Sequence, residues 1–316
     1  MIGFILAAGF GTRLLPLTDH IPKALVPVCG IPLLKRAHDF FTAGGITRIG
    51  VNAHHHPEQI GQFVRSSFPD VRMFHERGSI RGTGGAVDFA REFLGSDEAF
   101  CVANVDILTN ADLANLAQRF LQSSSSVGLV AAPAQNGTIR FSIATGEFAG
   151  TRSQRENTPD DKQKYGSADF IGITFYRKEF LSVLRDTDFN IIPVWIRARE
   201  AGMKVAVLGT GPVYWKDVGT FGNLAKIHFD VLDRTVELAP PDSMVVDYAE
   251  KRAYPKLFGQ PILRHLGPYT WIDAMTRIPD ESTFSKAVVF TDAVVPDGVS
   301  IENAIVTKYG VMSFEP

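Results

Sequence analysis

The chain has 316 residues, of which 45% are hydrophobic and 21% charged, with a formal net charge of -2 and a pI of about 6.5. This composition is that of a soluble globular protein with room for one large domain and a small one, and it excludes a global positive field for nucleic acid or an anionic membrane. The sequence also predicts no membrane span or signal peptide, and its two cysteines, Cys29 and Cys101, exclude a disulfide framework and favour a reducing cytoplasm.

Short apolar segments and amphipathic segments alternate over roughly the first 134 residues. The expected buried strands are residues 2–6, 48–53, 71–76, 99–106 and 127–133, and the expected helices are 33–43, 57–68, 85–94 and 112–122. This alternation predicts a Rossmann-like α/β fold with a mostly parallel sheet, right-handed crossovers and helices on both faces. Ligands of such sheets bind at the carboxyl ends of the strands, where the loop after residue 6 and Asp106 are both expected.

The middle of the chain is less regular. Residues 151–166 carry many charges without apolar periodicity, which predicts a mobile loop over the site. Strands at 169–176 and 204–208 and helices at 178–185, 191–201 and 220–236 follow. Consecutive prolines within residues 239–242 predict a boundary between a catalytic domain, 1–238, and a C-terminal domain, 239–316.

Small apolar residues recur every six positions in the tail, in two series. The first series is Ala287, Ala293, Val299 and Ile305, and the second is Val289, Val295 and Ile301. Hexad spacing favours a short left-handed β-helix-like domain, although a pair of alternating strands would give a similar pattern. Such a stub buries little alone, so we expect it to pack on the catalytic domain or to form a homo-oligomer.

The most informative stretch follows the first strand. It reads L-A-A-G-F-G-T-R-L from residue 6, continues as P-L-T at 16–18, and is followed by P-K-A-L-V-P-V at 22–28. Glycines at 9 and 11 allow a sharp turn that brings backbone N–H groups close to an anion, and Arg13 and Lys23 add positive charge. The stretch lacks the third glycine of a dinucleotide fingerprint and the G-K-[ST] ending of a P-loop.

The whole string instead resembles the signature of sugar-nucleotide pyrophosphorylases, enzymes that join a sugar 1-phosphate to a nucleoside triphosphate. The resemblance covers about residues 1–236 and implies a nucleotidyltransferase, GT-A-like fold. It implies that Arg13 and Lys23 are catalytic and bind the triphosphate, although an ordinary surface role is common for a lysine. The implied nucleotide-binding residues are Leu6, Ala7, Ala8, Gly9, Gly11, Thr12, Arg13, Lys23, Gly82, Thr83, Gly84 and Gly85. The last four belong to a G-T-G-G-A segment that would pack against the base, or would simply begin a helix.

Two aspartates complete the implied catalytic set. Asp106 ends the strand F-C-V-A-N-V-D, and Asp217 lies in W-K-D-V-G-T. The resemblance implies that both bind Mg²⁺ and take part in catalysis, whereas Asp106 alone would also suit a turn or helix cap. Val105 replaces the glycine that the family usually has before this aspartate.

The sugar side is less complete. Gly172, in D-F-I-G-I, resembles the family glycine beside the sugar, and Asn104 is the second expected sugar ligand. The family's glutamate-lysine pair is missing, so Lys162 or Lys164 is the expected substitute, with Lys164 preferred. Three adjacent histidines, His54-His55-His56, are expected in a solvated loop rather than on zinc, because neighbours in a strand exit cannot all face one metal.

The sequence therefore predicts a cytoplasmic, Mg²⁺-dependent enzyme that makes NDP-sugars, as used for cell-envelope polysaccharide. The G-T-G-G-A form favours GTP with mannose or heptose 1-phosphate, while UTP or dTTP enzymes share the layout. A non-catalytic NDP-sugar-binding regulatory subunit and a Rossmann oxidoreductase are the alternatives from other classes. No nucleic acid or membrane partner is expected.

Overall fold

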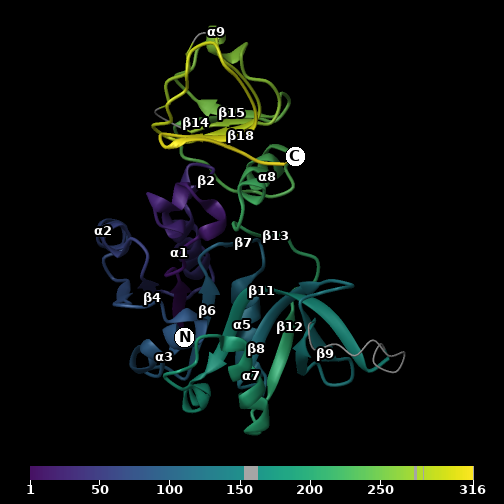
Figure 1. Ribbon diagram of the computed structural model, residues 1–316. Coiled ribbons are helices and arrows are strands. Elements are labelled where there is room, and N and C mark those ends of the chain that lie inside the picture. The colour runs from purple at the N-terminus through teal and green to yellow at the C-terminus, as the bar shows by residue number, and fades with distance from the viewer. Residues whose placement is uncertain (153–162, 274–275, 280, 316) are drawn as a thin grey trace. The chain divides into compact units, whose positions relative to one another are not determined.

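Buried apolar strands form the core of the first of two compact units, which comprises Met1–Phe10 and Ala37–Trp215. The computed structural model describes residues 1–152, 163–273, 276–279 and 281–315 (Figure 1). The strands of this unit are β1 (Ile2–Leu6), β4 (Arg48–Ala53), β5 (Arg72–His75), β6 (Ala99–Asn104), β7 (Ile107–Thr109), β8 (Val127–Pro133), β9 (Ile139–Ser142), β10 (Phe148–Thr151), β11 (Tyr165–Arg177) and β12 (Val205–Gly209). Its helices are α2 (Pro57–Ser67), α3 (Gly82–Phe89), α4 (Arg91–Leu94), α5 (Leu113–Gln122), the 3₁₀ helix η5 (Lys178–Val183) and α7 (Ile191–Glu200), while α1 (Leu33–Ala43) crosses from the second unit.

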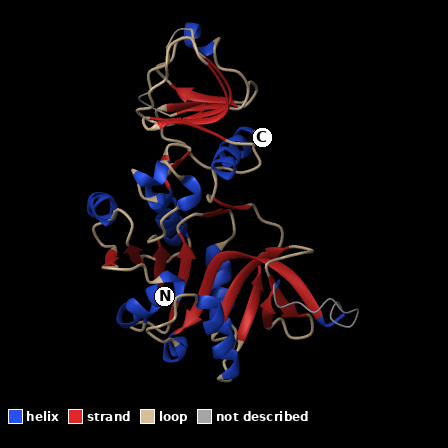
Figure 2. Ribbon diagram, viewed as in Figure 1, coloured by secondary structure: helices blue, strands red, loops and turns tan. Residues whose placement is uncertain are grey.

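The large sheet of this unit is mixed, with a parallel half around β1. Strand β1 pairs in parallel with β4 and β6, and β4 pairs in parallel with β5. Strand β11 is antiparallel to β6, β8 and β9, whereas β8 and β12 are parallel (Figure 2). The predicted α/β fold with a mostly parallel sheet is confirmed, and β9, β10 and β11 supply its antiparallel pairings.

Helices cover both faces of the parallel half. A Cβ added at Gly3 would meet Phe41 of α1, while one added at Gly50 would meet Phe93 of α4 on the opposite face. Phe4 and Phe93 belong to one buried cluster that also includes Trp195 of α7. Packing on both faces explains why these strands are continuous apolar runs instead of alternating ones.

Several predicted bounds differ from the observed ones. The helix predicted at 85–94 begins earlier, at Gly82, and is divided at Ala90 into α3 and α4. The segment predicted as a helix at 178–185 is the 3₁₀ helix η5. Strand β11 begins at Tyr165, because residues 165–168 pair with β9, whose hairpin with β10 the sequence analysis did not predict. Residues 153–162 of the predicted mobile loop lie outside the described residues.

The second unit comprises Gly11–Arg36 and Lys216–Pro316. It contains the 3₁₀ helices η1 (Thr12–Leu14), η2 (Leu17–Asp19) and η3 (Lys23–Leu25), strands β2 (Pro27–Val28) and β3 (Ile31–Pro32), α8 (Phe221–Leu232), α9 (Gln260–Leu263), and strands β14 (Met244–Asp247), β15 (Arg252–Pro255), β16 (Thr270–Ile272), β17 (Thr283–Val289), β18 (Ser300–Thr307) and β19 (Gly310–Ser313); β13 (Trp215–Asp217) crosses between the units. The boundary predicted at residue 239 lies inside this unit. Helix α8 joins the tail here because it contacts β17, β18 and β2.

The tail is a parallel solenoid capped by antiparallel strands. Strands β15 to β18 pair in parallel, and Arg252, Thr270, Ala287 and Ala304 stack in successive register, 17 or 18 residues apart. The residue before each of them has a left-handed backbone, namely Lys251, Tyr269, Lys286 and Asn303. Hexad positions such as Ala293, Val295 and Ile301 lie in the buried core of the coil. The sequence pattern therefore located a repeating coil, but it missed β15 and β16, whose residues do not show the hexad.

A buried polar cluster connects three segments of the second unit. The Cys29 N–H donates to His228 Nε2 at 2.9 Å, and the Nδ1 of the same ring lies 2.8 Å from the Leu224 carbonyl oxygen. Trp271, whose ring packs against His228, donates from Nε1 to Asp273 Oδ1 at 3.0 Å. This cluster joins the segment after β2, α8 and the solenoid.

Burial gives the cluster opposing pH dependences. It raises the pKa of Asp273 to about 7 and lowers the pKa of His228 to about 4. The folded chain therefore keeps the proton of Asp273 to higher pH than the unfolded chain, so this contribution to stability falls as pH rises from about 4 to about 7. The His228 contribution has the opposite sign, because the unfolded chain binds that proton up to about pH 6.5.

In Asp273→Asn only the His228 contribution remains. We therefore expect the free energy of unfolding of this variant to rise more steeply with pH than that of the parent between about pH 4.5 and about pH 6.5. The variant His228→Gln retains an acceptor for the Cys29 N–H and a donor for the Leu224 carbonyl oxygen. Its free energy of unfolding should fall as pH rises over the same range, because only the Asp273 contribution remains. Urea unfolding at several pH values measures both slopes, with the exposed Asp242→Asn as the control. Equal slopes in all four proteins would contradict the assigned protonation states.

Candidate functional site

The end of the Gly-rich stretch packs against the rest of its own signature in the second unit. Gly11 has φ +67°, and an added Cβ would lie 2.9 Å from Thr18 Cγ2 and 3.1 Å from Lys23 Cβ. Thr18 Oγ1 donates to the Gly11 carbonyl oxygen at 2.9 Å, and the Leu14 N–H donates to the same oxygen at 2.8 Å. Gly11 therefore has to be glycine for both its backbone angle and the close approach of Lys23.

Arg13 and Asp217 face each other across a glycine in this unit. Arg13 Nη2 lies 3.6 Å from Asp217 Oδ2, and the Arg13 side chain is 64% exposed. A Cβ at Gly219 would lie 2.5 Å from both atoms, so a larger residue there would displace the ends of these two side chains. Because the guanidinium is mostly exposed, its remaining N–H groups can bind an anionic ligand.

The Asp217 carboxylate is oriented by α8. Asn223 Nδ2 donates to Asp217 Oδ1 at 2.8 Å and to the Asp217 carbonyl oxygen at 3.0 Å. Thr220 caps the same helix by accepting from the Asn223 N–H. Asn223 carries no sequence signal for this role, because its contact with Asp217 depends on how the chain turns into α8. Oδ2 stays directed toward Arg13 and is a hard oxygen donor of the kind Mg²⁺ prefers.

Asp106 follows directly after the parallel pairing of β6 with β1 in the first unit. Leu6 pairs with Asn104, and the Val105 N–H extends the pairing by donating to the Leu6 carbonyl oxygen at 3.1 Å. Asp106 therefore leaves the carboxyl edge of the sheet as the sequence predicts. Asp106 and Asp217 belong to different compact units. Among the described residues, no group of three or more His, Cys, Asp or Glu side chains forms a cluster suited to a metal.

Two predicted sugar ligands lie together in the first unit. Gly172 has φ +77°, and an added Cβ would lie 3.1 Å from Asn104 Nδ2 and 2.7 Å from Ile107 Cγ1. The pairing of β11 with β8 shifts register between Phe170 and Thr174, so Gly172 sits at this irregularity. Lys164, by contrast, precedes β11, about 26 Å along an extended strand from Gly172. The structure does not bring Lys164 to the other two, and Lys162 lies outside the described residues.

The G-T-G-G segment begins α3 and packs tightly on the segment before α7. The Gly84 N–H donates to the Phe189 carbonyl oxygen at 3.1 Å, and Thr83 Oγ1 accepts from the Ile191 N–H at 3.0 Å. A Cβ at Gly82 would overlap the Phe189 carbonyl oxygen, and one at Gly84 would lie 2.6 Å from the Asp188 carbonyl oxygen. The close packing of this segment on residues 188–189 therefore explains why glycine is needed at positions 82 and 84, a reason that the sequence alone does not reveal.

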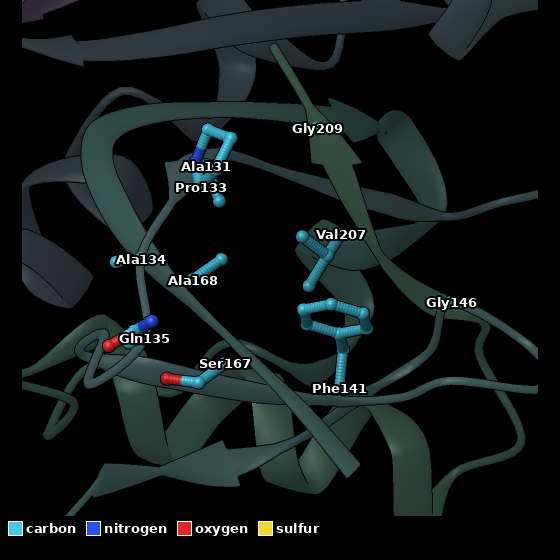
Figure 3. Close-up of a pocket in the computed structure, with 10 residues that line it drawn as sticks. All are labelled: Ala131, Pro133, Ala134, Gln135, Phe141, Gly146, Ser167, Ala168, Val207 and Gly209. Carbon is cyan, nitrogen blue, oxygen red and sulfur yellow. The ribbon is translucent and has the colours of Figure 1, made fainter. Parts of the chain in front are cut away.

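A separate cavity of about 570 Å³ lies among β8, β9, β11 and β12 (Figure 3). Phe141, Val207 and Ala168 line it, and none of its lining residues is charged. A triphosphate needs cations or directed N–H groups, so this cavity does not suit the predicted chemistry. None of the predicted site residues contributes to it.

In the described part of the chain, no helix has the length and apolar character needed to cross a bilayer.

Comparisons with known proteins agree with the signature. Residues 2–147 match the nucleotidyl transferase family. The N-acetylmuramate alpha-1-phosphate uridylyltransferase of Caulobacter vibrioides is 26% identical over 234 residues, which cover 69% of this chain and 91% of that protein. The mannose-1-phosphate guanyltransferase of Hypocrea jecorina is 33% identical over 112 residues, 34% of this chain and 31% of the relative. Bifunctional protein GlmU of Methanococcus aeolicus is also 33% identical, over 44% of this chain and 33% of its own length. Apart from the Caulobacter protein, these relatives are thus matched over about a third of their length.

Solved structures share the fold. A putative glucose-1-phosphate thymidylyltransferase from Bacillus anthracis, in complex with a sucrose, superposes with a TM-score of 0.61 at 20% identity, covering 76% of this chain and 98% of that one. HddC from Yersinia pseudotuberculosis, complexed with GMP-PN, gives a TM-score of 0.58 at 20% identity, covering 72% and 97%.

A glycine series separates backbone strain from packing in the G-T-G-G segment. Gly78→Ala introduces only a left-handed alanine, since its φ is +79° with nothing within 4 Å, and should cost about 1–2 kcal/mol. Gly84→Ala introduces only the overlap with Asp188, and Gly82→Ala introduces both. We expect Gly82→Ala to reduce the free energy of unfolding most, by about 3 kcal/mol or more. Urea denaturation measures the order, and a Gly82→Ala loss no larger than that of Gly78→Ala would refute the packing role.

Proposed function

We propose that this chain, which belongs to the nucleotidyl transferase family, joins a nucleoside triphosphate to a sugar 1-phosphate and releases pyrophosphate. The observation that carries the proposal is the arrangement of the signature in the second unit. Gly11 brings Lys23 against the end of the Gly-rich turn, and Gly219 leaves room for Arg13 beside Asp217. An enzyme that handles a triphosphate needs such fixed cations, because the transferred group and the leaving group are both anionic.

In the proposed reaction, a phosphate oxygen of the sugar 1-phosphate attacks the α-phosphorus of the triphosphate in line with the leaving pyrophosphate. One P–O bond forms at the α-phosphorus and the bond to the β-phosphate oxygen breaks. The attacking phosphate is largely ionised at neutral pH, since its second pKa is about 6, so no general base is required. Arg13 and Lys23 would hold the triphosphate, and Lys23 would offset the charge that develops on pyrophosphate.

Asp106 and Asp217 would hold Mg²⁺, and their oxygens suit that ion. When bound, the ion neutralises phosphate charge and orients the α-phosphate. Asn223 fixes the Asp217 carboxylate through Oδ1. Asn104 and Gly172, which lie together, would contact the sugar.

For the substrates, we propose GTP with mannose or heptose 1-phosphate, on the form of the G-T-G-G-A segment. UTP with an amino sugar 1-phosphate is the second candidate, favoured by the uridylyltransferase alignment that covers 69% of this chain. A matrix of five nucleoside triphosphates against sugar 1-phosphates, scored by pyrophosphate release, tests both. We expect one base to be preferred by at least about tenfold in kcat/KM. Tight NDP-sugar binding without pyrophosphate release across the whole matrix would instead favour a non-catalytic regulatory subunit.

The two aspartates give a direct test of the metal assignment. We expect Asp106→Asn and Asp217→Asn each to lower kcat/KM at least about a hundredfold, because each removes an anionic oxygen ligand. Initial rates over a range of Mg²⁺ concentrations measure the loss and any rise in the Mg²⁺ requirement. Asp70→Asn and Asp242→Asn change exposed aspartates, one in each unit, and should keep parental activity. Full activity in both Asp106→Asn and Asp217→Asn would refute the assignment.

A further inference from the structure

Two buried polar side chains bridge the strand ends of the first unit. Asn52 of β4 is 2% exposed, and Glu76, the residue after β5, is 1% exposed. Asn52 Nδ2 donates to Glu76 Oε1 at 2.7 Å. A buried carboxylate is unfavourable unless its oxygens are hydrogen-bonded, so such a pair needs a reason beyond filling the core.

The outer ends of the pair bind two backbone N–H groups. The Ala7 N–H donates to Asn52 Oδ1 at 2.7 Å, and the Arg81 N–H donates to Glu76 Oε2 at 2.8 Å. Ala7 begins the Gly-rich stretch after β1, and Arg81 directly precedes the G-T-G-G segment. The result is a continuous chain of three short hydrogen bonds between the two segments predicted to bind the nucleotide.

Glu76 itself is held from both sides. Its N–H donates to the Ala53 carbonyl oxygen at 2.9 Å, and its carbonyl oxygen lies 3.0 Å from His54 Nδ1. Both carboxylate oxygens already accept hydrogen bonds, and the side chain is buried. Because the Glu76 side chain is only 1% exposed, it does not contact a bound nucleotide, and its effect on nucleotide binding passes through the segments it holds.

We propose that Asn52 and Glu76 are positioning residues. They fix the distance between the Gly-rich turn that begins at Ala7 and the G-T-G-G segment, so that both segments can bind one nucleoside triphosphate. The inference rests on the proposed function and on the nucleotide-binding role that the family signature implies for both segments. Hydrogen bonds to charged groups in a buried setting are the strong ones, so the pair holds both segments before the nucleotide arrives.

The direction of the hydrogen bonds allows a swap experiment. In Glu76→Gln, an amide group faces either Asn52 Nδ2 or the Arg81 N–H, so one hydrogen bond is lost. In Asn52→Asp, two carboxylates lie side by side in the interior. In the double variant Asn52→Asp/Glu76→Gln, the aspartate accepts from Ala7 and from the new amide, whose oxygen accepts from Arg81. All three hydrogen bonds are restored with the charge moved to position 52.

The measurements are KM and kcat for the preferred nucleoside triphosphate, KM for the sugar 1-phosphate, and the melting temperature. We expect each single variant to raise the triphosphate KM at least about tenfold with kcat and the sugar phosphate KM within about threefold, and the double variant to return within about threefold of the parent. Glu92→Gln, an exposed glutamate in the same unit, is the matched control and should match the parent.

The outcomes separate this inference from the proposed function. Single variants with a lowered melting temperature but an unchanged triphosphate KM would show a structural role alone and overturn the inference. A folded double variant whose triphosphate KM stays raised about tenfold would overturn it as well, and this variant decides the matter if a single variant does not fold. A parent that neither binds a triphosphate nor releases pyrophosphate would overturn the proposed function, and with it the inference.

Discussion

Parallel pairing of β1 with β4 on one side and β6 on the other is the constraint on which the first unit depends. Leu6 at the end of β1 stands level with Asn52 and Asn104, so the ends of three strands share one edge of the sheet. The turn after β1 and the residues assigned to the sugar, Asn104 and Gly172, meet at that edge. Asn52 can reach Ala7, and Asn104 can lie against Gly172, only because the strands end together.

The second unit shows how a signature can be explained by packing within itself. Gly11 is required by its φ of +67° and by the close approach of Thr18 and Lys23, and Gly219 leaves the ends of the Arg13 and Asp217 side chains undisturbed. The segment that follows Lys23 is held to α8 by the hydrogen bond from the Cys29 N–H to His228, and the His228 ring packs against Trp271 of the solenoid. The solenoid is therefore part of the structure that holds the segment after Lys23 in place.

Buried polar groups occur in both units, but burial has a different consequence in each. Asn52 and Glu76 bond to each other, and each also accepts from a backbone N–H of a neighbouring segment, which suits a role in positioning those segments. His228 and Asp273 have pKa values displaced in opposite directions by burial, so both are neutral over a shared range of pH. In each case the low exposure makes the hydrogen bonds strong and makes the loss of one partner expensive.

The sequence by itself determined the strands β1, β4 and β8 and the helix α1 to the residue, because their apolar periodicity and turn residues are local. It also determined the family signature, since glycines and cations at fixed spacing along the chain need no partner to be recognised. Only the tertiary structure decided that Glu76 joins Asn52 to the Arg81 N–H, and that the backbone of residues 188–189 occupies the space where a Cβ of Gly82 or Gly84 would lie. It also decided that Lys164 precedes the long strand β11, far from Gly172. These features depend on which distant segments meet, and strand pairing and packing set those contacts, which no local pattern records.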